Sequence, residues 1–317
     1  MASFDVLAVG ELNPDLILAG IRSDNARLGT EQEFDGYHLT LGSSTAIACV
    51  VMQRLGLNTA LSAYVGDDDY GRFCRAVLEG EGVDTRLVRT HSALPTGLTV
   101  CLPYPSDRML LTCKGTMSLN SADVLDAAVL SRARHVHVGS FFLQTDLRPA
   151  VAELFAAARQ QLGITTSLDT GWDPEERWLS DDLRRALSHT SYLFPNALEF
   201  ENLTGQTDLE SGIVALLDLG VDTVVLKRGA LGAVHATLSE RAEHAGFAAR
   251  SIDTTGAGDA FNAGYLAAAL RGDGPADRLA FGNACGALTV AAVGGTNGVI
   301  DGDQVRAFVA AQSDANP

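Results

Sequence analysis

A short turn in the last quarter of the chain carries the residues with the clearest chemical potential. Residues 253–259 read Asp-Thr-Thr-Gly-Ala-Gly-Asp and lead directly into an apolar segment of helical character. The free amides of a first helical turn, with the positive end of the helix dipole, can hold an anion without any basic side chain. Asp259 stands in this turn, where the amides favour its ionised form and it could accept the proton of an alcohol. The alternative is a loop in which Asp259 only supports the helix N-terminus.

The overall charge sets a condition on any anionic ligand. The 317 residues include 23 basic and 39 acidic ones, which gives a formal net charge of −16 and a pI near 4.7. Such a surface repels nucleic acid phosphates and anionic lipid, so we expect neither nucleic acid nor a membrane as a partner. An anion must therefore be attracted by a local arrangement of donors such as the turn at 253–259.

The elements that position this turn follow an alternating order. Short apolar runs alternate with longer segments of helical period, which predicts a doubly wound, mainly parallel α/β sheet with helices on both faces. The predicted strands cover 6–9, 59–65, 135–138, 164–168, 192–194 and 223–226. The predicted helices cover 46–55, 70–79, 149–161, 197–203, 210–219, 260–271, 276–293 and 304–312.

Two segments interrupt the alternation. Residues 31–40, and residues 98–102 with 109–112 on either side of a Pro-Tyr-Pro-Ser-Asp turn at 103–107, suggest antiparallel strands outside the main sheet. We therefore predict one α/β domain over 1–317 with a small β-lid from about 12–40 and 96–115. The exposed strand edges of this lid favour a homodimer.

The cysteines and the N-terminal segment point to a reducing compartment. The five cysteines form no CxxC pair and lie in or beside apolar stretches, so we expect them to be reduced. Asp5 and Glu11 interrupt the region that would have to be the apolar core of a signal peptide, and no run approaches the length of a membrane span. The expected location is the cytoplasm.

Five motifs in this order resemble those of the ribokinase-like (PfkB) carbohydrate kinases. The turn at 253–261 is similar to the second signature of that family, and four further segments agree with it across most of the chain. These segments are Gly-Glu-Leu-Asn-Pro-Asp at 10–15, Gly-Asp-Asp-Asp-Tyr-Gly at 66–71, Pro-Asn-Ala-Leu-Glu at 195–199 and Val-Leu-Lys-Arg-Gly-Ala-Leu-Gly at 225–232. The resemblance implies a ribokinase-like fold and ATP-dependent transfer of phosphate to a hydroxyl group.

The resemblance also implies roles at the acceptor end of the site. Asp259 would be the general base, while the amides of Gly256, Ala257 and Gly258 would form the anion hole for the transferring phosphoryl group. The residues implied to bind substrate are Asn13, Asp15, Gly42, Ser43, Phe141 and Asp169. From the residues alone, Phe141 is equally well a core side chain.

At the nucleotide end the resemblance implies two groups of residues. Those implied to bind ATP are Asn196, Lys227, Gly229, Gly232 and Asn283, and those implied to hold metals are Glu199 for Mg²⁺ through water and Asp253 with Thr255 for a monovalent cation such as K⁺. The residues alone leave plain alternatives open. Asn196 with Glu199 could be a helix cap, Lys227 a solvated side chain, and Asp253 a cap of its own turn.

Two departures from the family pattern bear on the substrate. Ile47 stands where the first signature usually carries an asparagine that contacts sugar hydroxyls, and isoleucine has no hydrogen-bonding group. The run Asp-Thr-Gly-Trp-Asp at 169–173 lacks the basic residue expected for sugar acids, and only Arg108 in the lid is placed to supply one. We therefore expect a neutral sugar, with a nucleoside as the alternative.

Other function classes are less well supported. A catalytically silent sugar- or nucleotide-binding regulatory relative fits Ile47 and Gly171, but the retained Asp259 turn argues against it. A dinucleotide oxidoreductase is disfavoured because Phe261 occupies the third glycine position of the Gly-rich fingerprint. A P-loop enzyme is excluded because no GxxxxGK[ST] run occurs in the sequence.

Overall fold

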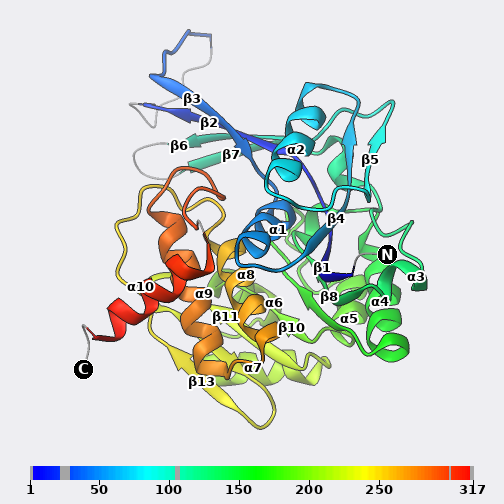
Figure 1. Cartoon of the computed structure of the whole chain (residues 1–317), viewed down its shortest axis with the longest axis vertical. Helices are drawn as coiled ribbons and strands as arrows, with labels where there is room; N and C mark the ends of the chain where they lie inside the picture. Colours follow the sequence, from blue (N-terminus) through cyan, green and yellow to red (C-terminus); the bar gives the residue numbers. More distant parts are fainter. Residues whose placement is uncertain (1–2, 22–28, 104–107, 300, 315–317) are drawn as a thin grey trace.

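The computed structural model describes residues 3–21, 29–103, 108–299 and 301–314, which form one large and one small sheet (Figure 1). The large sheet has the strand order β13-β12-β11-β10-β9-β8-β1-β4-β5. Its strands are β1 (Phe4–Val9), β4 (Thr59–Gly66), β5 (Val88–His91), β8 (Ala133–Val138), β9 (Thr165–Leu168), β10 (Tyr192–Leu193), β11 (Thr223–Lys227), β12 (Ala233–Ala236) and β13 (Arg241–His244).

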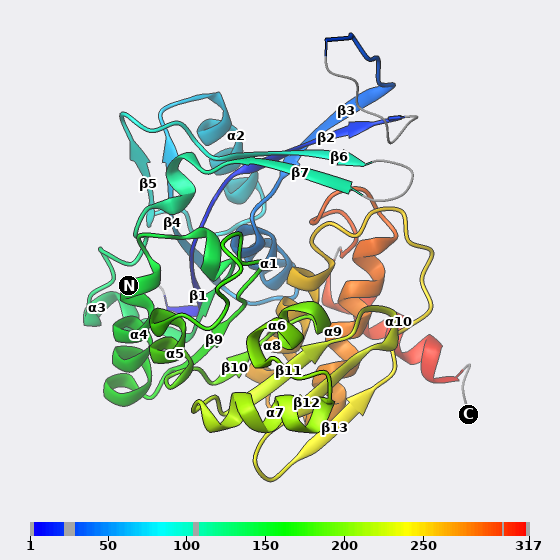
Figure 2. The ribbon, with the colours of Figure 1, turned by 180° about the vertical axis from the view of Figure 1, so that it is seen from behind.

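Helices cover both faces of the large sheet, as predicted. Helices α4 (Arg148–Ala156), α5 (Asp181–Leu187), α6 (Ala197–Thr204) and α7 (Leu209–Asp218) share one core, while α1 (Ser44–Arg54), α8 (Ala257–Arg271), α9 (Pro275–Val290) and α10 (Gly302–Asp314) share the other. Helices α2 (Asp69–Gly80) and α3 (Ala127–Leu130) complete the set of α-helices in the described chain. Figures 1 and 2 show the two layers from opposite sides.

Strand β1 explains why the sheet needs both layers. Val6 belongs to the core shared with α8, whereas Leu7 belongs to the core shared with α4, and both are fully buried. Neighbouring side chains on a strand point to opposite faces, so an unbroken apolar run requires cover on both sides. The strand pairs in parallel with β4 and β8, which confirms its predicted place inside a parallel sheet.

The small sheet stands apart from the main body at the top of Figure 1. It has the order β3-β2-β6-β7, formed by β3 (Gly36–Leu41), β2 (Pro14–Ala19), β6 (Leu98–Pro103) and β7 (Arg108–Cys113). The β6–β7 pair is the antiparallel hairpin predicted around residues 103–107, whereas β2 and β6 run parallel. Most of that turn, Tyr104–Asp107, lies outside the described residues, as does the side chain of Arg108.

Two features differ from the sequence-based expectation. Strands β12 and β13, of which β13 forms the edge of the sheet, pair antiparallel and were not predicted. The α-helix predicted through 161 ends at Ala156 and continues as a π-helical turn over Ala157–Gln161, although no glycine or proline marks the change. In the described part of the chain, no helix combines the length and apolar character needed to cross a bilayer.

Candidate active site

The candidate catalytic side chains gather beyond the carboxyl ends of parallel strands. Glu11 follows β1, Asp169 follows β9, and Lys227 ends β11. In doubly wound sheets ligands bind at this edge, close to the point where the strand order reverses. Here the chain leaves β1 toward β4 on one side and returns as β8 on the other, so the reversal lies beside β1.

The turn before α8 has the geometry that the sequence suggested for an anion hole. Gly256 is the N-cap residue of α8 and has a φ of 73°, a left-handed conformation that favours glycine. A Cβ on Gly256 would lie 2.5 Å from the Cα of Gly295 and 3.1 Å from Cγ2 of Ile47. Among the described residues no side chain caps α8, and the amide of Ala257 makes one long hydrogen bond, 3.4 Å, to the carbonyl of Thr254.

Asp259 lies in the first turn of α8 and is half-buried. Its Oδ1 accepts a hydrogen bond from the hydroxyl of Ser44, the first residue of α1. Burial raises the pKa of Asp259 to about 7, and the charge of Asp169 adds to the effect. Ser44 and Lys227 oppose this rise. A carboxyl group with such a pKa can take up a proton near neutral pH, as a general base must.

Lys227 is tied to a buried carboxylate instead of being solvated. Its Nζ lies 2.6 Å from Oδ2 of Asp169 and 3.3 Å from Oδ1 of Asn262. Asn262 in turn donates to the same Asp169 oxygen at 2.6 Å. Burial is the largest influence on the pKa of Lys227 and lowers it, but the charges of Asp169, Glu199 and Asp259 together with the hydrogen bond to Asp169 outweigh burial, so the pKa is raised and the ammonium form is held. A Cβ on Gly258 would lie 3.5 Å from Nζ, which places this cation beside the start of α8.

Asn196 and Glu199 form a capping box at the start of α6. The side chain of Asn196 accepts from the backbone amide of Glu199 at 2.9 Å, and the Glu199 carboxylate accepts from the backbone amide of Asn196 at 2.9 Å. This is the structural alternative that the sequence left open. Asn196 is exposed while Glu199 is buried, and burial with the nearby Asp169 charge raises the pKa of Glu199 to about 7.

A cavity of about 670 Å³ brings most of the predicted ATP-binding residues together. Its lining includes Lys227, Gly229, Gly232 and Asn283 together with Ala257 and Gly258 of the turn. Asn196 is not part of this lining. The remaining wall is mostly small and apolar, as a flat aromatic base requires.

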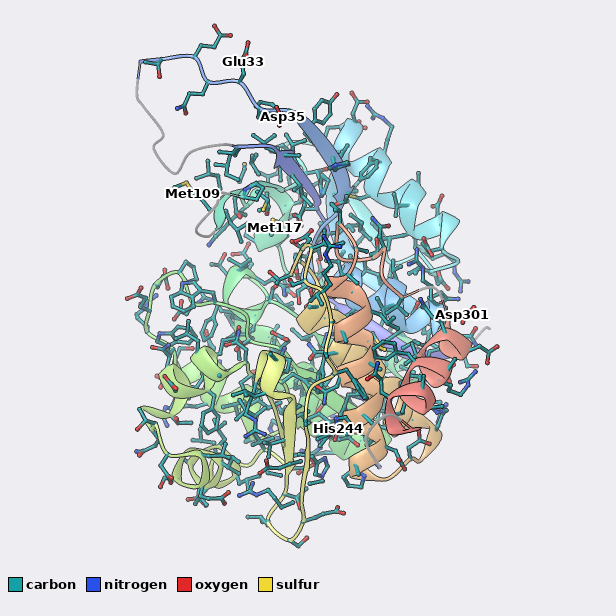
Figure 3. All side chains as sticks on the ribbon, turned by 90° about the vertical axis from the view of Figure 1, so that its left-hand side faces the viewer. Glu33, Asp35, Met109, Met117, His244 and Asp301 are labelled. Atoms are coloured by element: carbon teal, nitrogen blue, oxygen red, sulfur yellow. The ribbon has the colours of Figure 1, made fainter. Side chains whose placement is uncertain are left out.

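Close backbone packing shapes the nucleotide side of this cavity. Gly232 has a φ of 82°, and a Cβ there would overlap the carbonyl oxygen of His244. Asn283, which is buried, donates to His244 Nδ1 at 3.1 Å, so its amide group is engaged with β13. Figure 3 labels His244 at this position, next to α9.

At the acceptor end, Asn13 and Asp15 lie at the root of the small sheet. Asn13 is buried and donates to the carbonyl of Pro14 at 3.0 Å, while its Oδ1 has no hydrogen-bond partner among the described residues. A Cβ on Gly42 would overlap the carboxylate of Asp15, so only glycine permits Asp15 to sit there. These residues therefore form one group, as predicted.

Two residues predicted to bind substrate make structural contacts instead. Ser43 caps α1: its hydroxyl accepts from the amide of Ala46 at 3.1 Å and donates to the carbonyl of Glu11 at 2.7 Å. The ring of Phe141 is 1% exposed and packs edge-on against Phe142, so it belongs to the core. A stacking role for Phe141 remains a prediction that its burial does not favour.

Asp253 and Thr255 are bonded to each other before α8. Oδ1 of Asp253 accepts from the amide and the hydroxyl of Thr255, at 2.9 and 2.7 Å. Its Oδ2 accepts from the amide of Gly294 at 2.9 Å. Asp253 thus caps its own turn and joins it to the 292–294 segment, which was predicted to provide carbonyl ligands for a cation.

Three residues that contact the candidate site residues were not predicted from the sequence: Glu11, Ser44 and Asn262. The sequence places Glu11 in the motif at 10–15 but gives it no role of its own. In the structure Glu11 is buried, and burial raises the pKa of its carboxyl group. Asn262 lies three residues after Asp259 on the same helical face, a spacing that could have indicated it. Ser44 gave no comparable signal, since its partner lies 215 positions away.

Known proteins resemble the chain over nearly its whole length. The family model for pfkB family carbohydrate kinases matches residues 3–301. An ATP-dependent ribose-1-phosphate kinase from Halopiger xanaduensis is 32% identical over 98% of this chain and 99% of its own length. A ribokinase from Haemophilus influenzae is 28% identical over 83% of this chain and 85% of its own.

Solved structures agree on the fold. A ribokinase from Arabidopsis thaliana, complexed with ribose and ATP, superposes with a TM-score of 0.82 at 22% identity and covers 98% of this chain and 99% of its own. A fructokinase from Xylella fastidiosa with bound ATP gives a TM-score of 0.83 at 20% identity, covering 97% and 98%. With the family match over residues 3–301, the order of the motifs and the turn at 253–259, the conclusion is that this chain belongs to the pfkB family of carbohydrate kinases.

Proposed function

We propose that the protein transfers the terminal phosphoryl group of ATP to a hydroxyl of a neutral sugar, with Asp259 as general base. The observation that carries this proposal is the placement of Asp259, half-buried with a pKa near 7, in the same first turn of α8 as the anion-hole amides. The acceptor hydroxyl would give its proton to Asp259 while its oxygen attacks the phosphorus. The amides of Gly256, Ala257 and Gly258 would stabilise the charge of the transferring group.

The charge around the base supports a neutral acceptor. Asp259 is acted on by the carboxylates Asp169 and Glu11 and by the single cation Lys227. Lys227 is already paired with Asp169, so it cannot fully balance a further anion. An acceptor that carries a phosphate or a carboxylate would meet net repulsion here. A nucleoside, whose sugar is also uncharged, is the alternative acceptor.

Nucleotide would occupy the cavity beside Lys227, with its base between the apolar wall and Asn283. Mg²⁺ suits this site because Glu199 offers a carboxylate to its water shell, and the ion would neutralise charge on the phosphates. Asp253 and Thr255, with carbonyls of the 292–294 segment, offer only oxygen atoms, which suits K⁺. An E. coli protein described as a candidate ribokinase II is known in complex with ATP and Mg²⁺, which supports this assignment.

The small sheet would serve as a lid over the acceptor. Asn13, Asp15 and Gly42 lie at its root, so a movement of the sheet would act directly on the acceptor site. A closed lid would exclude water, which competes with the sugar for the phosphoryl group.

The experiment is a coupled assay of ADP release with purified protein, MgATP and a panel of acceptors. The panel contains ribose, fructose, other neutral sugars, sugar acids, nucleosides and ribose 1-phosphate. We expect kcat/KM for at least one neutral acceptor to exceed that for ribose 1-phosphate by about tenfold, because the carboxylates around Asp259 repel the phosphate of the latter. A tenfold ratio corresponds to a difference of about 1.4 kcal/mol in transition-state free energy. The opposite ranking would refute the neutral acceptor but leave the kinase assignment in place.

The role of Asp259 is tested with the acceptor found in that panel. Asp259→Asn should lower kcat by about 10²-fold or more, because it removes the proton acceptor at constant size. Asp277→Asn is the matched control, since Asp277 is also the third residue of its helix, α9, and is exposed. Unchanged kcat in Asp259→Asn would refute the mechanism. Binding of ATP without turnover of any acceptor would instead favour the regulatory relative.

A further inference from the structure

A serine of α1 contacts the proposed base from the opposite side of the site. The hydroxyl of Ser44 donates to Oδ1 of Asp259. Ser44 is the first residue of α1 and Asp259 is the third residue of α8, so the N-terminal ends of two helices meet at this carboxylate. The positive ends of both helix dipoles favour its ionised form.

The position of Ser44 is set by its neighbour Thr45. The hydroxyl of Thr45 donates to Oε2 of Glu11 at 2.7 Å, and its amide donates to Oε1 at 3.3 Å. A Cβ on Gly10 would overlap this hydroxyl, and a Cβ on Gly139 would lie 2.9 Å from it. Thr45 is thus wedged between the segments that follow β1 and β8, and this anchors the start of α1.

The two serines at this helix start have different tasks. Ser43 is buried, and its hydroxyl accepts from the amide of Ala46 and donates to the carbonyl of Glu11. Ser44 is half-buried and directs its hydroxyl at Asp259. Only Ser44 therefore joins the anchored start of α1 to the base.

We propose that Ser44 is a positioning residue that holds Oδ1 of Asp259 and so directs Oδ2 to the acceptor hydroxyl. This inference rests on the proposed function, in which Asp259 is the general base. In the reaction the acceptor O–H proton passes to Oδ2, the acceptor oxygen forms the new bond to phosphorus, and the bond from phosphorus to the ADP oxygen breaks. Ser44 keeps its own proton throughout.

The charges that face Asp259 explain why a donor is needed there. Asp169 after β9 and Glu11 after β1 repel its negative form, whereas Lys227 at the end of β11 attracts it. Burial is the largest influence and also disfavours the charge. The Ser44 hydroxyl lowers the pKa of Asp259 against these effects, so its loss should move the pKa upward.

The test is the pH dependence of kcat/KM in Ser44→Ala, Ser44→Cys and Ser44→Thr. Ser44→Ala removes the hydrogen bond from the Ser44 hydroxyl to Oδ1 of Asp259. Because hydrogen bonds to charged groups are stronger than neutral ones, its loss should lower kcat about tenfold. The acid limb of its kcat/KM profile should move to higher pH, while KM for ATP stays unchanged. Ser44→Thr keeps the hydroxyl and should restore both properties. Ser44→Cys keeps nearly the same volume with a weak donor and should behave like Ser44→Ala.

Ser211→Ala is the matched control. Ser211 also donates its hydroxyl to a carboxylate at a helix start, Oδ2 of Asp208 at 2.7 Å, but it is exposed on α7. A purely structural role of Ser44 would lower thermal stability without moving the pH midpoint, and that result would overturn the proposal. Asp259→Asn is measured in parallel. If the Asp259→Asn variant stays active, the proposed function fails. If that variant is inactive while Ser44→Ala and Ser44→Cys match the wild type, only the positioning role of Ser44 fails.

Discussion

The buried carboxyl group of Asp259 lowers the stability of the fold when it is ionised. Its ordinary pKa of 3.8 is raised to about 7, first by burial and then by the charge of Asp169. Between these pH values the folded protein holds a proton that the unfolded chain has released. The contribution of this group to the free energy of unfolding therefore falls as pH rises from 3.8 toward 7, and the full penalty is present above that.

Asp259→Asn should therefore raise the melting temperature at pH 8. Asparagine has the same shape, still accepts from Ser44, and brings no charge near Asp169. The gain should shrink at pH 5, where the aspartate of the folded wild type is protonated. Thermal unfolding followed by circular dichroism at both pH values measures this, with Asp277→Asn as the control. A lower melting temperature of Asp259→Asn at pH 8 would contradict the account.

At the scale of elements, the start of α8 depends on the absence of a side chain at Gly256. Its left-handed φ and the approach of Gly295 both oppose a Cβ. Gly256→Ala should cost about 1–3 kcal/mol in the free energy of unfolding. It should also lower kcat more strongly than it raises KM for the acceptor, because in the proposed mechanism the displaced amides act mainly in the transition state.

Denaturant unfolding and steady-state kinetics of Gly256→Ala measure both effects. Gly274→Ala offers a control, since Gly274 is the N-cap residue of α9, has a φ of −70°, and a Cβ there would make only an ordinary contact of 3.9 Å with Oδ2 of Asp277. Equal loss of activity in both variants would show that the close approach at Gly256 is not the cause.

The turn before α2 has a structural role of its own. Asp68 accepts from the amide of Gly71 at 2.8 Å and from the amide and hydroxyl of Thr96, both at 2.7 Å. It thereby caps α2 and holds the segment that leads into β6 of the small sheet. Although burial acts in the opposite direction, these hydrogen bonds lower the pKa of Asp68 below its ordinary value of 3.8.

Asp68→Ala should lower the free energy of unfolding by about 1–3 kcal/mol, since it removes a helix cap and leaves donors unpaired. The stabilisation by Asp68 is present above pH 3.8 and is lost as pH falls through its lowered pKa in the folded protein. The stability difference from the wild type should therefore be constant between pH 5 and 8. Urea unfolding at several pH values measures it, and a difference that vanishes at pH 7 would contradict the prediction.

The elements that could be predicted from the sequence are those with a clear apolar run or a distinctive turn beside them. The six predicted parallel strands are present, with the clearest apolar runs in β1 and β11, and α8 follows its glycine-rich turn. Strands β12 and β13 were not predicted, because their sequences, Ala-Val-His-Ala and Arg-Ala-Glu-His, form no apolar run bounded by turn residues. The contacts of Ser44 with Asp259 and of Thr45 with Glu11 join distant positions through the tertiary structure, and a single sequence carries no local signal for them.

At the scale of the whole molecule, the small sheet exposes apolar side chains on both of its edge strands. On β7, Met109, Leu110 and Leu111 are 47%, 53% and 54% exposed, and Tyr37 on β3 is 68% exposed. Figure 3 shows the labelled Met109 on this sheet. Such apolar surface favours the homodimer expected from the sequence, because a second copy would cover it.

Leu110→Lys should weaken this dimer. A charge on β7 would have to be desolvated when two sheets meet, whereas it is well hydrated in the monomer. Analytical ultracentrifugation over a range of concentrations should show a dimer for the wild type and a monomer at equal concentration for the variant. Leu238→Lys, an exposed leucine outside the small sheet, is the control. A monomeric wild type would contradict the prediction.

The path of the chain through the sheet has a consequence for biosynthesis. β1 leaves the ribosome before its partner strand β8, since Phe4 pairs with Ala133, and Ser44 is synthesised long before its hydrogen-bond partner Asp259. The nascent chain therefore carries Ser44 without its carboxylate partner until the start of α8 has been synthesised. Contacts between segments so far apart also slow folding. During renaturation, enzymatic activity should return only after the helical signal has recovered.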